Sequence, residues 1–336
     1  MTISDLEHFK KLLVEREANV LEWLDSPTTP NEQDVIKAQS LVGEIKEALQ
    51  RVESHTYGTC IDCKEGIELY RLEIQPVTEV CLGCITAEER AQLEEELFLA
   101  SKIHRALLPQ TVEKIEGFEI AVNSLAARIV GGDYYDFLPS SSNNSTRIII
   151  ADTMGKGIAA GLIMSNVQGA LRILAEDIIL PCQLLTRLNQ WLCRNIPVTK
   201  FISLACIALD TSRPESSRLT FANAGHCPGL LIGRNGALTC LDPTGGVLGV
   251  HPGFVYEDEV ISFNPGDLLV LYTDGVTEAE NYHDDMFGIE RLTQYLQDHR
   301  SEPLDLLIEN LLAEVKFFSE RPEFADDSTV IAVRKL

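Results

Sequence analysis

Aspartates in the second half of the chain recur at the ends of short apolar runs, usually with a glycine close by. Glycine lets a backbone or a ligand approach closely, and a strand end holds a carboxylate rigidly. Burying several such charges together is prohibitive unless cations neutralise them, and ligation by oxygen alone favours Mg²⁺ or Mn²⁺. The four sites are Val130–Asp136, Arg147–Gly157, Leu268–Gly275 and Phe324–Val333.

Each of these motifs is weak by itself, because Asp-Gly is often a plain turn. Gly155-Lys156 does not begin a phosphate loop, since Ile150 stands where that motif needs glycine and Gly157 where it needs Ser or Thr. Neither Gly-x-Ser-x-Gly nor His-Glu-x-x-His occurs, so serine-hydrolase and zincin chemistry have no support.

Four of the nine cysteines form two Cys-x-x-Cys pairs separated by residues 64–80. Two such pairs can complete one tetrahedral thiolate site, which is typical of structural zinc. Reduced cytosolic thiols disfavour disulfides, and a thioredoxin-like role would need a βαβ unit. We therefore predict one structural Zn²⁺ bound by Cys60, Cys63, Cys81 and Cys84. The remaining five cysteines are expected to be buried thiols.

The composition indicates a soluble, acidic protein of one to three domains. The chain has 336 residues, 45% hydrophobic and 24% charged, with a net charge of −23. That charge argues against non-specific nucleic-acid binding and against adsorption to anionic lipid. The apolar runs are far shorter than the ~20 residues that span a bilayer, and no signal peptide is recognisable at the amino terminus. We expect a cytoplasmic location.

Helical patterns flank the cysteine pairs. An apolar stripe through Leu6, Phe9 and Leu13 predicts a first helix, the Pro-rich run 26–31 ends it, and a second amphipathic stretch covers about residues 32–52. So short a break predicts an antiparallel hairpin. A third helix begins after Thr86, which can form a capping box with Glu89.

Two interpretations of the third helix, which ends at Pro109, stay open. In the first, a coiled-coil seam joins two copies as a homodimer, with His104 as one polar member. In the second, the helix packs against the following domain. The predicted seam is Leu93, Leu97, Ala100, His104 and Leu107, and the alternative face is Leu93, Leu97, Ile103 and Leu107.

The first part of the chain resembles the DksA/TraR family over about 85 residues. The shared residues are Tyr57–Cys63, Ile67, Arg71–Glu73, Pro76 and Cys81–Cys84. The resemblance implies a helical hairpin followed by a zinc module. Members of that family can bind RNA polymerase through acidic residues at the hairpin tip, but the tip at 26–34 lacks their Asp-x-x-Asp-x-Ala pattern. We carry over the fold and the zinc only.

Residues from about 90 to 336 resemble the PPM (protein phosphatase 2C-like) family, in its bacterial SpoIIE/RsbU branch. The resemblance implies an α+β fold, with a C-terminal α/β/β/α sandwich of two antiparallel sheets flanked by helices, and the removal of phosphate from Ser/Thr of proteins. Besides the four acidic sites, it rests on Ile103–Pro109, Leu219–Pro228, Gly249 and Gly266–Ala279.

The same resemblance implies the site residues, all taken as catalytic ligands of two Mn²⁺ or Mg²⁺ ions. Asp152 and the Thr153 carbonyl would bridge the two metals, and Asp133 would bind one of them. Asp274 and Asp326 would bind the other, with Asp327 as the alternative to Asp326.

Three further residues are assigned from the same comparison. Asp136 is expected at the surface rather than reaching a metal through water, and His226 is expected to shape a loop rather than act as a general acid. The turn after Asp152 departs from the branch's frequent Asp-x-Ser-Gly-His-Gly by having Met154 and Lys156. Because this departure is in the turn and not at a ligand, we expect metal binding to be intact.

The domain organisation expected is a helical hairpin over 1–53, a zinc finger over 54–86, a linker helix over 87–109 and a phosphatase domain over 110–336. The branch's usual substrates imply a phosphorylated anti-anti-sigma (STAS-like) protein as the partner. One alternative is a catalytically weak scaffold whose zinc hairpin binds RNA polymerase, although the intact aspartate set argues against it. A second alternative is a redox sensor that uses Cys60 or Cys63.

Overall fold

The computed structural model of the chain describes residues 3–24, 32–111, 114–139, 145–210, 218–321 and 324–336. The chain divides into two compact units, Met1–Glu95 and Glu96–Leu336. Each unit has a hydrophobic core of its own.

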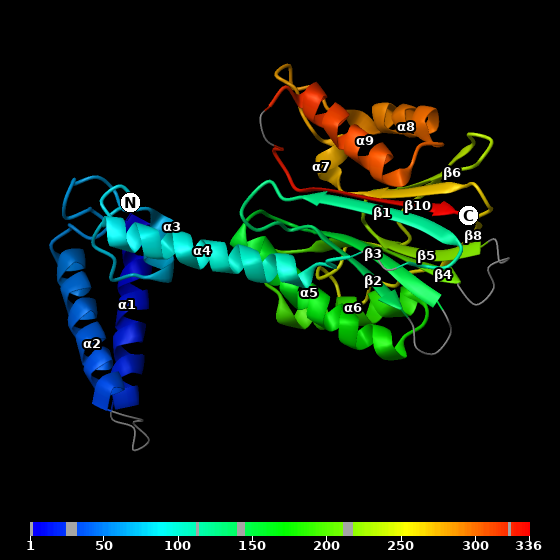
Figure 1. Cartoon of the computed structure of the whole chain (residues 1–336). Coiled ribbons are helices and arrows are strands. Elements are labelled where there is room, and N and C mark those ends of the chain that lie inside the picture. The colour runs from blue at the N-terminus through cyan, green and yellow to red at the C-terminus, as the bar shows by residue number, and fades with distance from the viewer. Residues whose placement is uncertain (1–2, 25–31, 112–113, 140–144, 211–217, 322–323) are drawn as a thin grey trace. The chain divides into compact units, whose positions relative to one another are not determined.

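The first unit begins with two long helices, α1 (Ile3–Leu24) and α2 (Glu32–Glu53), which pack against each other (Figure 1). Their facing sides bury Phe9, Leu13 and Ile45, as the apolar stripe predicts. The predicted helical pair is therefore confirmed. Most of its tip, residues 25–31, lies outside the described residues.

A small module with one short helix, α3 (Leu69–Ile74), follows the pair. The Tyr57 hydroxyl donates a hydrogen bond to the Pro76 carbonyl at 2.7 Å, and Arg71 donates to the Val80 carbonyl at 2.7 Å. These bonds explain why the residues shared with the DksA/TraR family recur together, since each fixes one cysteine-bearing loop against another part of the module.

Helix α4 (Ala87–Leu107) begins at the predicted capping box. The Thr86 amide donates to Glu89 Oε2 at 2.8 Å, and the Glu89 amide donates to Thr86 Oγ1 at 3.1 Å. These reciprocal bonds satisfy two amides at the helix start.

Each predicted face of this helix is wrong at one residue, at His104 for the seam and at Ile103 for the alternative face. Ile103 is exposed, and so is Leu93, as a seam between two copies would leave it in a single chain. His104, expected to interrupt an apolar seam, is instead 7% exposed and faces the second unit's own core. His104 is more deeply buried than the apolar residues of either predicted face, because Gly161 on the facing helix leaves space for its ring.

The second unit contains two five-stranded sheets, shown one above the other in Figure 1. Every pair of neighbouring strands in both sheets is antiparallel. One sheet has the order β1 (Phe118–Leu125), β10 (Ser328–Lys335), β9 (Leu268–Tyr272), β6 (Gly229–Ile232), β7 (Leu238–Leu241). The other has the order β2 (Tyr134–Pro139), β3 (Ser145–Thr153), β4 (Ile202–Asp210), β5 (Arg218–Ala224), β8 (Glu259–Ser262).

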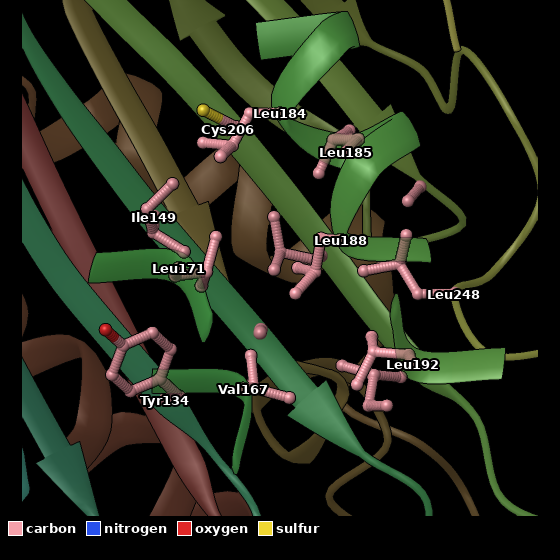
Figure 2. Close-up of a cluster of buried hydrophobic side chains, with 14 of the residues drawn as sticks. Tyr134, Ile149, Val167, Leu171, Leu184, Leu185, Leu188, Leu192, Cys206 and Leu248 are labelled. Atoms are coloured by element: carbon pink, nitrogen blue, oxygen red, sulfur yellow. The ribbon is translucent and has the colours of Figure 1, made fainter. Parts of the chain in front are cut away.

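Helices cover the outer face of each sheet, and apolar side chains fill the three spaces between layers. Figure 2 shows one of these spaces, where Leu171, Leu188 and Ile149 meet between helices and sheet. The predicted α/β/β/α sandwich is confirmed. The covering helices are α5 (Ile158–Asp177) and α6 (Pro181–Asn195) on one side, with α7 (Asp274–Thr277), α8 (Gly288–His299) and α9 (Leu304–Ser319) on the other.

Helix α5 is the one helix in the described part of the chain that is long and apolar enough to cross a membrane. Half of its most apolar window is buried inside the unit, where Met164, Val167 and Leu171 pack in the core. Such burial is what a core helix requires.

The cysteines outside the predicted zinc site do not share one environment. Cys206 is fully buried in the core, whereas Cys240 is exposed at the edge strand β7. The expectation of five buried thiols is therefore met only by Cys206. Cys182, Cys193 and Cys227 are half-buried, and Cys240 is exposed because residues of an edge strand can face solvent.

Candidate functional site

The first candidate site is the four-cysteine group of the first unit. The Sγ atoms of Cys60, Cys63, Cys81 and Cys84 all lie within 4.8 Å of one another. Cys63 Sγ and Cys81 Sγ are 3.6 Å apart, which is too long for a disulfide, and all four cysteines are free thiols. The four thiols therefore form one cluster of free cysteines rather than two disulfides.

The electrostatics of this cluster suit a thiolate site. The backbone amides of Cys63 and Cys81 lower the pKa of the Cys60 thiol to about 6, against the effect of burial. Neighbouring sulfurs, Cys63 first, raise the pKa of Cys84 to about 12. Cys60 ionises easily, whereas its neighbours make the ionisation of Cys84 unfavourable. A divalent metal ion fits this cluster, because its positive charge would stabilise all the thiolates together.

The second candidate site is built from strand ends of both sheets in the second unit. In one sheet, Tyr134 pairs with Ala151, so Asp133, just before β2, lies beside Asp152, near the end of β3. The Thr153 carbonyl turns toward the same end, since it lies 3.0 Å from where a Cβ on Gly132 would be. Three of the predicted ligands are thereby brought to one edge.

The other sheet presents the remaining carboxylates. Val330 pairs with Tyr272, so Asp274, just after β9, lies beside the residues that lead into β10. Gly275 makes this approach sterically feasible, because a Cβ there would be 2.0 Å from the Asp327 carbonyl oxygen. The glycine after Asp274 is thus required by close backbone packing and is more than a turn residue.

Two threonine hydroxyls connect the two sheets at this edge. Asp133 Oδ2 accepts hydrogen bonds from Thr273 Oγ1 at 2.8 Å and from Thr329 Oγ1 at 2.7 Å. Thr273 Oγ1 also accepts a bond from the Thr329 amide at 2.9 Å. Asp133 is 4% exposed, so this network fixes a buried carboxylate between β9 and β10. Both threonines lie inside the aspartate motifs of the sequence, but the spacing of those motifs does not indicate that their hydroxyls bind Asp133.

The carboxylates repel one another. Burial, and then the charges of Asp274, Asp326 and Asp327, raise the pKa of Asp152 to about 7. Burial and the charge of Asp152 likewise raise the pKa of Asp133 well above its usual value. Burial, followed by Glu278 and Asp326, raises the pKa of Asp274. Mutual repulsion of this kind is relieved by bound cations.

The carboxylate oxygens of the aspartates are farther apart than the sulfur atoms of the cysteine cluster. Within the described ranges, the four cysteines are the one group of three or more Cys, His, Asp or Glu whose ligand atoms all lie within 4.8 Å of each other. The aspartates come from two sheets and are spread more widely. Their oxygen-only chemistry and mutual repulsion fit Mg²⁺ or Mn²⁺, which bind oxygen ligands and retain water.

The structure distinguishes Asp326 from Asp327. Both oxygens of Asp327 accept backbone hydrogen bonds, from Ala127 at 2.7 Å and from Gly132 at 2.6 Å. Asp327 is buried and holds the loop before β2, whereas Asp326 is partly exposed and contacts a lysine. The Asp327 carboxylate is thus occupied by two backbone amides, whereas the Asp326 carboxylate is partly open to solvent.

Asp136 is not at the surface, contrary to expectation. It is 2% exposed, pairs with Arg172 at 2.9 Å and accepts a hydrogen bond from the Tyr134 hydroxyl at 2.6 Å. An arginine on the covering helix α5 compensates its charge, and spacing along β2 does not reveal that partner.

His226 is buried in the turn after β5. Its Nδ1 is 2.8 Å from Ser203 Oγ, and its amide donates to Asn223 Oδ1 at 2.7 Å. Burial lowers the pKa of its imidazole to about 4, so the ring is neutral at pH 7. These contacts give it a role in shaping the loop.

His104 was not expected to lie near this site. Its ring packs against Gly161 of α5 and interacts with the Gly131 carbonyl, two residues from Asp133. Any side chain at Gly161 would collide with Val130, 2.2 Å from the Cβ position. The absence of a side chain at Gly161 is what allows His104 to make this contact.

Comparison with known proteins gives two family matches. Residues 142–336 match the family described as Stage II sporulation protein E (SpoIIE), and residues 55–90 match the prokaryotic dksA/traR C4-type zinc finger. The first match covers more than half of the chain. It begins after Asp133, so the place of that residue depends on the structure.

Two curated relatives come from Bacillus subtilis. The chain is 29% identical to phosphoserine phosphatase RsbU over 247 residues, which are 73% of this chain and 71% of the relative. It is 25% identical to phosphoserine phosphatase RsbP over 248 residues, which are 71% of this chain and 58% of the relative.

Solved structures share the fold. The PP2C domain of SiaA from Pseudomonas aeruginosa matches with a TM-score of 0.64 and 22% identity, over 74% of this chain and 99% of that one. The RsbU and RsbW domains of a Mycobacterium tuberculosis protein match with a TM-score of 0.58 and 25% identity, over 68% and 63% of the two chains. The predicted order of a zinc finger followed by a PP2C-like phosphatase domain is confirmed, and the chain belongs to the Stage II sporulation protein E (SpoIIE) family.

Proposed function

We propose that the second unit is a metal-dependent phosphatase that hydrolyses phosphoserine or phosphothreonine in a protein. The observation that carries this proposal is the hydrogen-bond network around Asp133. It connects the strand ends of one sheet to those of the other, so carboxylates far apart in the sequence face one another. Membership of the SpoIIE family and the two phosphoserine phosphatase relatives support the same reaction class.

Two Mn²⁺ or Mg²⁺ ions are the proposed cofactors. Asp152 and the Thr153 carbonyl would be shared between them, Asp133 would serve one, and Asp274 with Asp326 would serve the other. When bound, such ions supply an activated hydroxide and neutralise the phosphate in an in-line displacement. The protein's part is to hold Asp133 immobile through two hydroxyls and to keep the carboxylates ionisable at neutral pH, which the cations make favourable.

The proposed substrate is a phosphorylated anti-anti-sigma (STAS-like) protein in the cytoplasm. The resemblance to the SpoIIE/RsbU branch supports this choice. The acidic net charge of the chain argues against nucleic acid or a membrane as a partner. The proposed domains remain a hairpin over 1–53, a zinc finger over 54–86, a linker helix over 87–109 and the phosphatase over 110–336. The zinc ion would be structural, because four thiolates leave no open position for water.

A phosphatase assay tests the proposal. Zinc-loaded full-length chain would be incubated with p-nitrophenyl phosphate and with a phosphoserine-containing STAS protein, in buffer with EDTA, Mg²⁺ or Mn²⁺. We expect hydrolysis of both with Mn²⁺ or Mg²⁺ and none with EDTA. Hydrolysis that continues unchanged in EDTA would contradict a metal-dependent mechanism. Hydrolysis of the small ester but not of the STAS protein would support a metal-dependent phosphatase and would contradict the proposed protein substrate.

A further inference from the structure

Lys156 places a positive charge directly on one of the proposed metal ligands. Its Nζ lies 2.7 Å from Asp326 Oδ2 and donates a hydrogen bond to the Ala325 carbonyl at 2.8 Å. The ammonium is therefore fixed on two consecutive residues at the entrance to β10. Its charge also opposes the effect of burial and neighbouring carboxylates on the pKa of Asp274.

The turn that carries Lys156 is built to present it. The Met154 amide donates to the Phe201 carbonyl at 3.0 Å, which fixes the start of the turn to the segment before β4. Gly155 and Gly157, on either side of Lys156, have φ of +108° and +73°, a backbone conformation that favours glycine. Lys156 thus occupies the centre of a tight turn between β3 and α5.

The ion pair is accessible to solvent, with side-chain exposures of 46% for Lys156 and 43% for Asp326. Exposed ion pairs contribute little to stability, so this contact is not needed to hold the fold. A divalent cation that reaches Asp326 has to displace the ammonium or share the carboxylate with it. A single tethered charge and a double charge from solution therefore compete for one oxygen ligand.

On the basis of the proposed metal-dependent phosphatase, we propose that Lys156 is a tethered cation that competes with Mn²⁺ or Mg²⁺ for Asp326. Its presence raises the metal concentration that the enzyme needs. Lys156 is thus a residue that sets metal affinity, in a turn where Met154 and Lys156 depart from the frequent pattern of the branch.

Calorimetric titration of Mn²⁺ into metal-free, zinc-loaded full-length chain at about 150 mM salt tests this inference, because that salt screens distant charges. Lys156→Gln should bind Mn²⁺ about two- to tenfold more tightly than the parent, since only a weak exposed pair is removed. Lys156→Arg, which keeps the charge, should bind within about twofold of the parent. Lys200→Gln is the matched control, because Lys200 Nζ also contacts this turn, at the Met154 carbonyl, and should change affinity less than twofold.

A double-mutant cycle with Asp326→Asn makes the test specific. The gain from Lys156→Gln should disappear when Asp326 is already neutral. An affinity for Lys156→Gln equal to or weaker than the parent's, or a gain that persists in the Asp326→Asn background, would overturn the inference. If neither Asp274→Asn nor Asp326→Asn changes the titration of the parent, these carboxylates do not bind the metal, and the proposed metal site fails together with this inference.

Discussion

The two candidate metal sites of this chain are built in opposite ways. The four cysteines lie within 25 residues, and their sulfur atoms are already gathered within 4.8 Å. The aspartates span almost 200 residues, come from two sheets and repel one another. A site made by short loops is preformed by local structure, whereas a site made by strand ends exists only when the whole sandwich has folded. We expect the first to hold its metal tightly and the second to exchange it.

The largest effect expected from this difference is on metal retention. EDTA concentrations that silence the phosphatase should leave one zinc per chain, because closed thiolate sites contribute on the order of 10–16 kcal/mol to folding while carboxylate sites hold Mg²⁺ or Mn²⁺ weakly. Elemental analysis before and after EDTA measures this. Cys63→Ser should lose the zinc, and Cys240→Ser, at an exposed cysteine outside the site, should keep it. Anaerobically purified protein without zinc would refute the prediction.

The burial of Asp152, together with the charges of the neighbouring aspartates, predicts an unusual pH dependence for the chain without divalent cations in the second site. The pKa of Asp152 is raised from 3.8 to about 7, so folding favours its protonated form. This stabilisation is fully present below about pH 4 and is lost as the pH rises through about 7, by at most about 4 kcal/mol. The free energy of unfolding should fall over that window.

Asp152→Asn tests this pH dependence, because asparagine stays neutral at every pH. Urea unfolding in EDTA should show a smaller fall for this variant than for the parent between pH 4 and 7. Asp242→Asn, at an exposed position, should behave as the parent does. Equal slopes for the parent and Asp152→Asn would show that the raised pKa of Asp152 does not cause the fall in stability.

We expect the two hydrogen bonds from threonine hydroxyls to Asp133, which join the two sheets, to have a large effect on turnover. Thr273→Val removes one bond to Asp133 and leaves the Thr329 amide without its acceptor. We expect a loss of about 10- to 100-fold in activity, as for other groups that orient metal ligands. Thr186→Val is the control, because its hydroxyl donates to the Cys182 carbonyl on α6, on the outer layer. Equal loss in both variants would indicate general destabilisation.

The smallest effect predicted concerns helix α4. Leu97 is half-buried beside a cavity of about 570 Å³ that is also lined by Val130, Lys156 and Ile158. Leu97→Glu would place a charge beside the strand ends, and turnover on the protein substrate should change severalfold at constant zinc content. Leu93→Glu, at an exposed position, should have no effect. If turnover and oligomeric state are both unchanged in Leu97→Glu, the helix is only a tether.

How far the sequence predicts each site follows from the same contrast. The four-cysteine cluster could be predicted in full because spacing along one short segment determines its geometry. The aspartates could be predicted as strand-end residues, but their partners could not. Arg172 on Asp136 and Lys156 on Asp326 come from elements distant in sequence, and periodicity carries no information about such pairs.

The choice between Asp326 and Asp327 shows the same limit. Adjacent residues point in different directions, and the two amides that hold Asp327 belong to a loop about 200 residues earlier. His104 is a further case, since its burial depends on the space left by Gly161 on another helix. The layered fold was predictable because it depends on patterns that repeat along each strand and helix, whereas these single contacts do not repeat.

The central claim is that the strand-end aspartates form a working metal site, and Asp274→Asn tests it most directly. Hydrolysis of p-nitrophenyl phosphate at saturating Mn²⁺ should fall more than about 100-fold, because removing even a group that only orients a ligand costs 10- to 100-fold. Far-UV circular dichroism and zinc content should be unchanged, since the substitution relieves repulsion in the folded chain. Turnover within twofold of the parent would contradict the account.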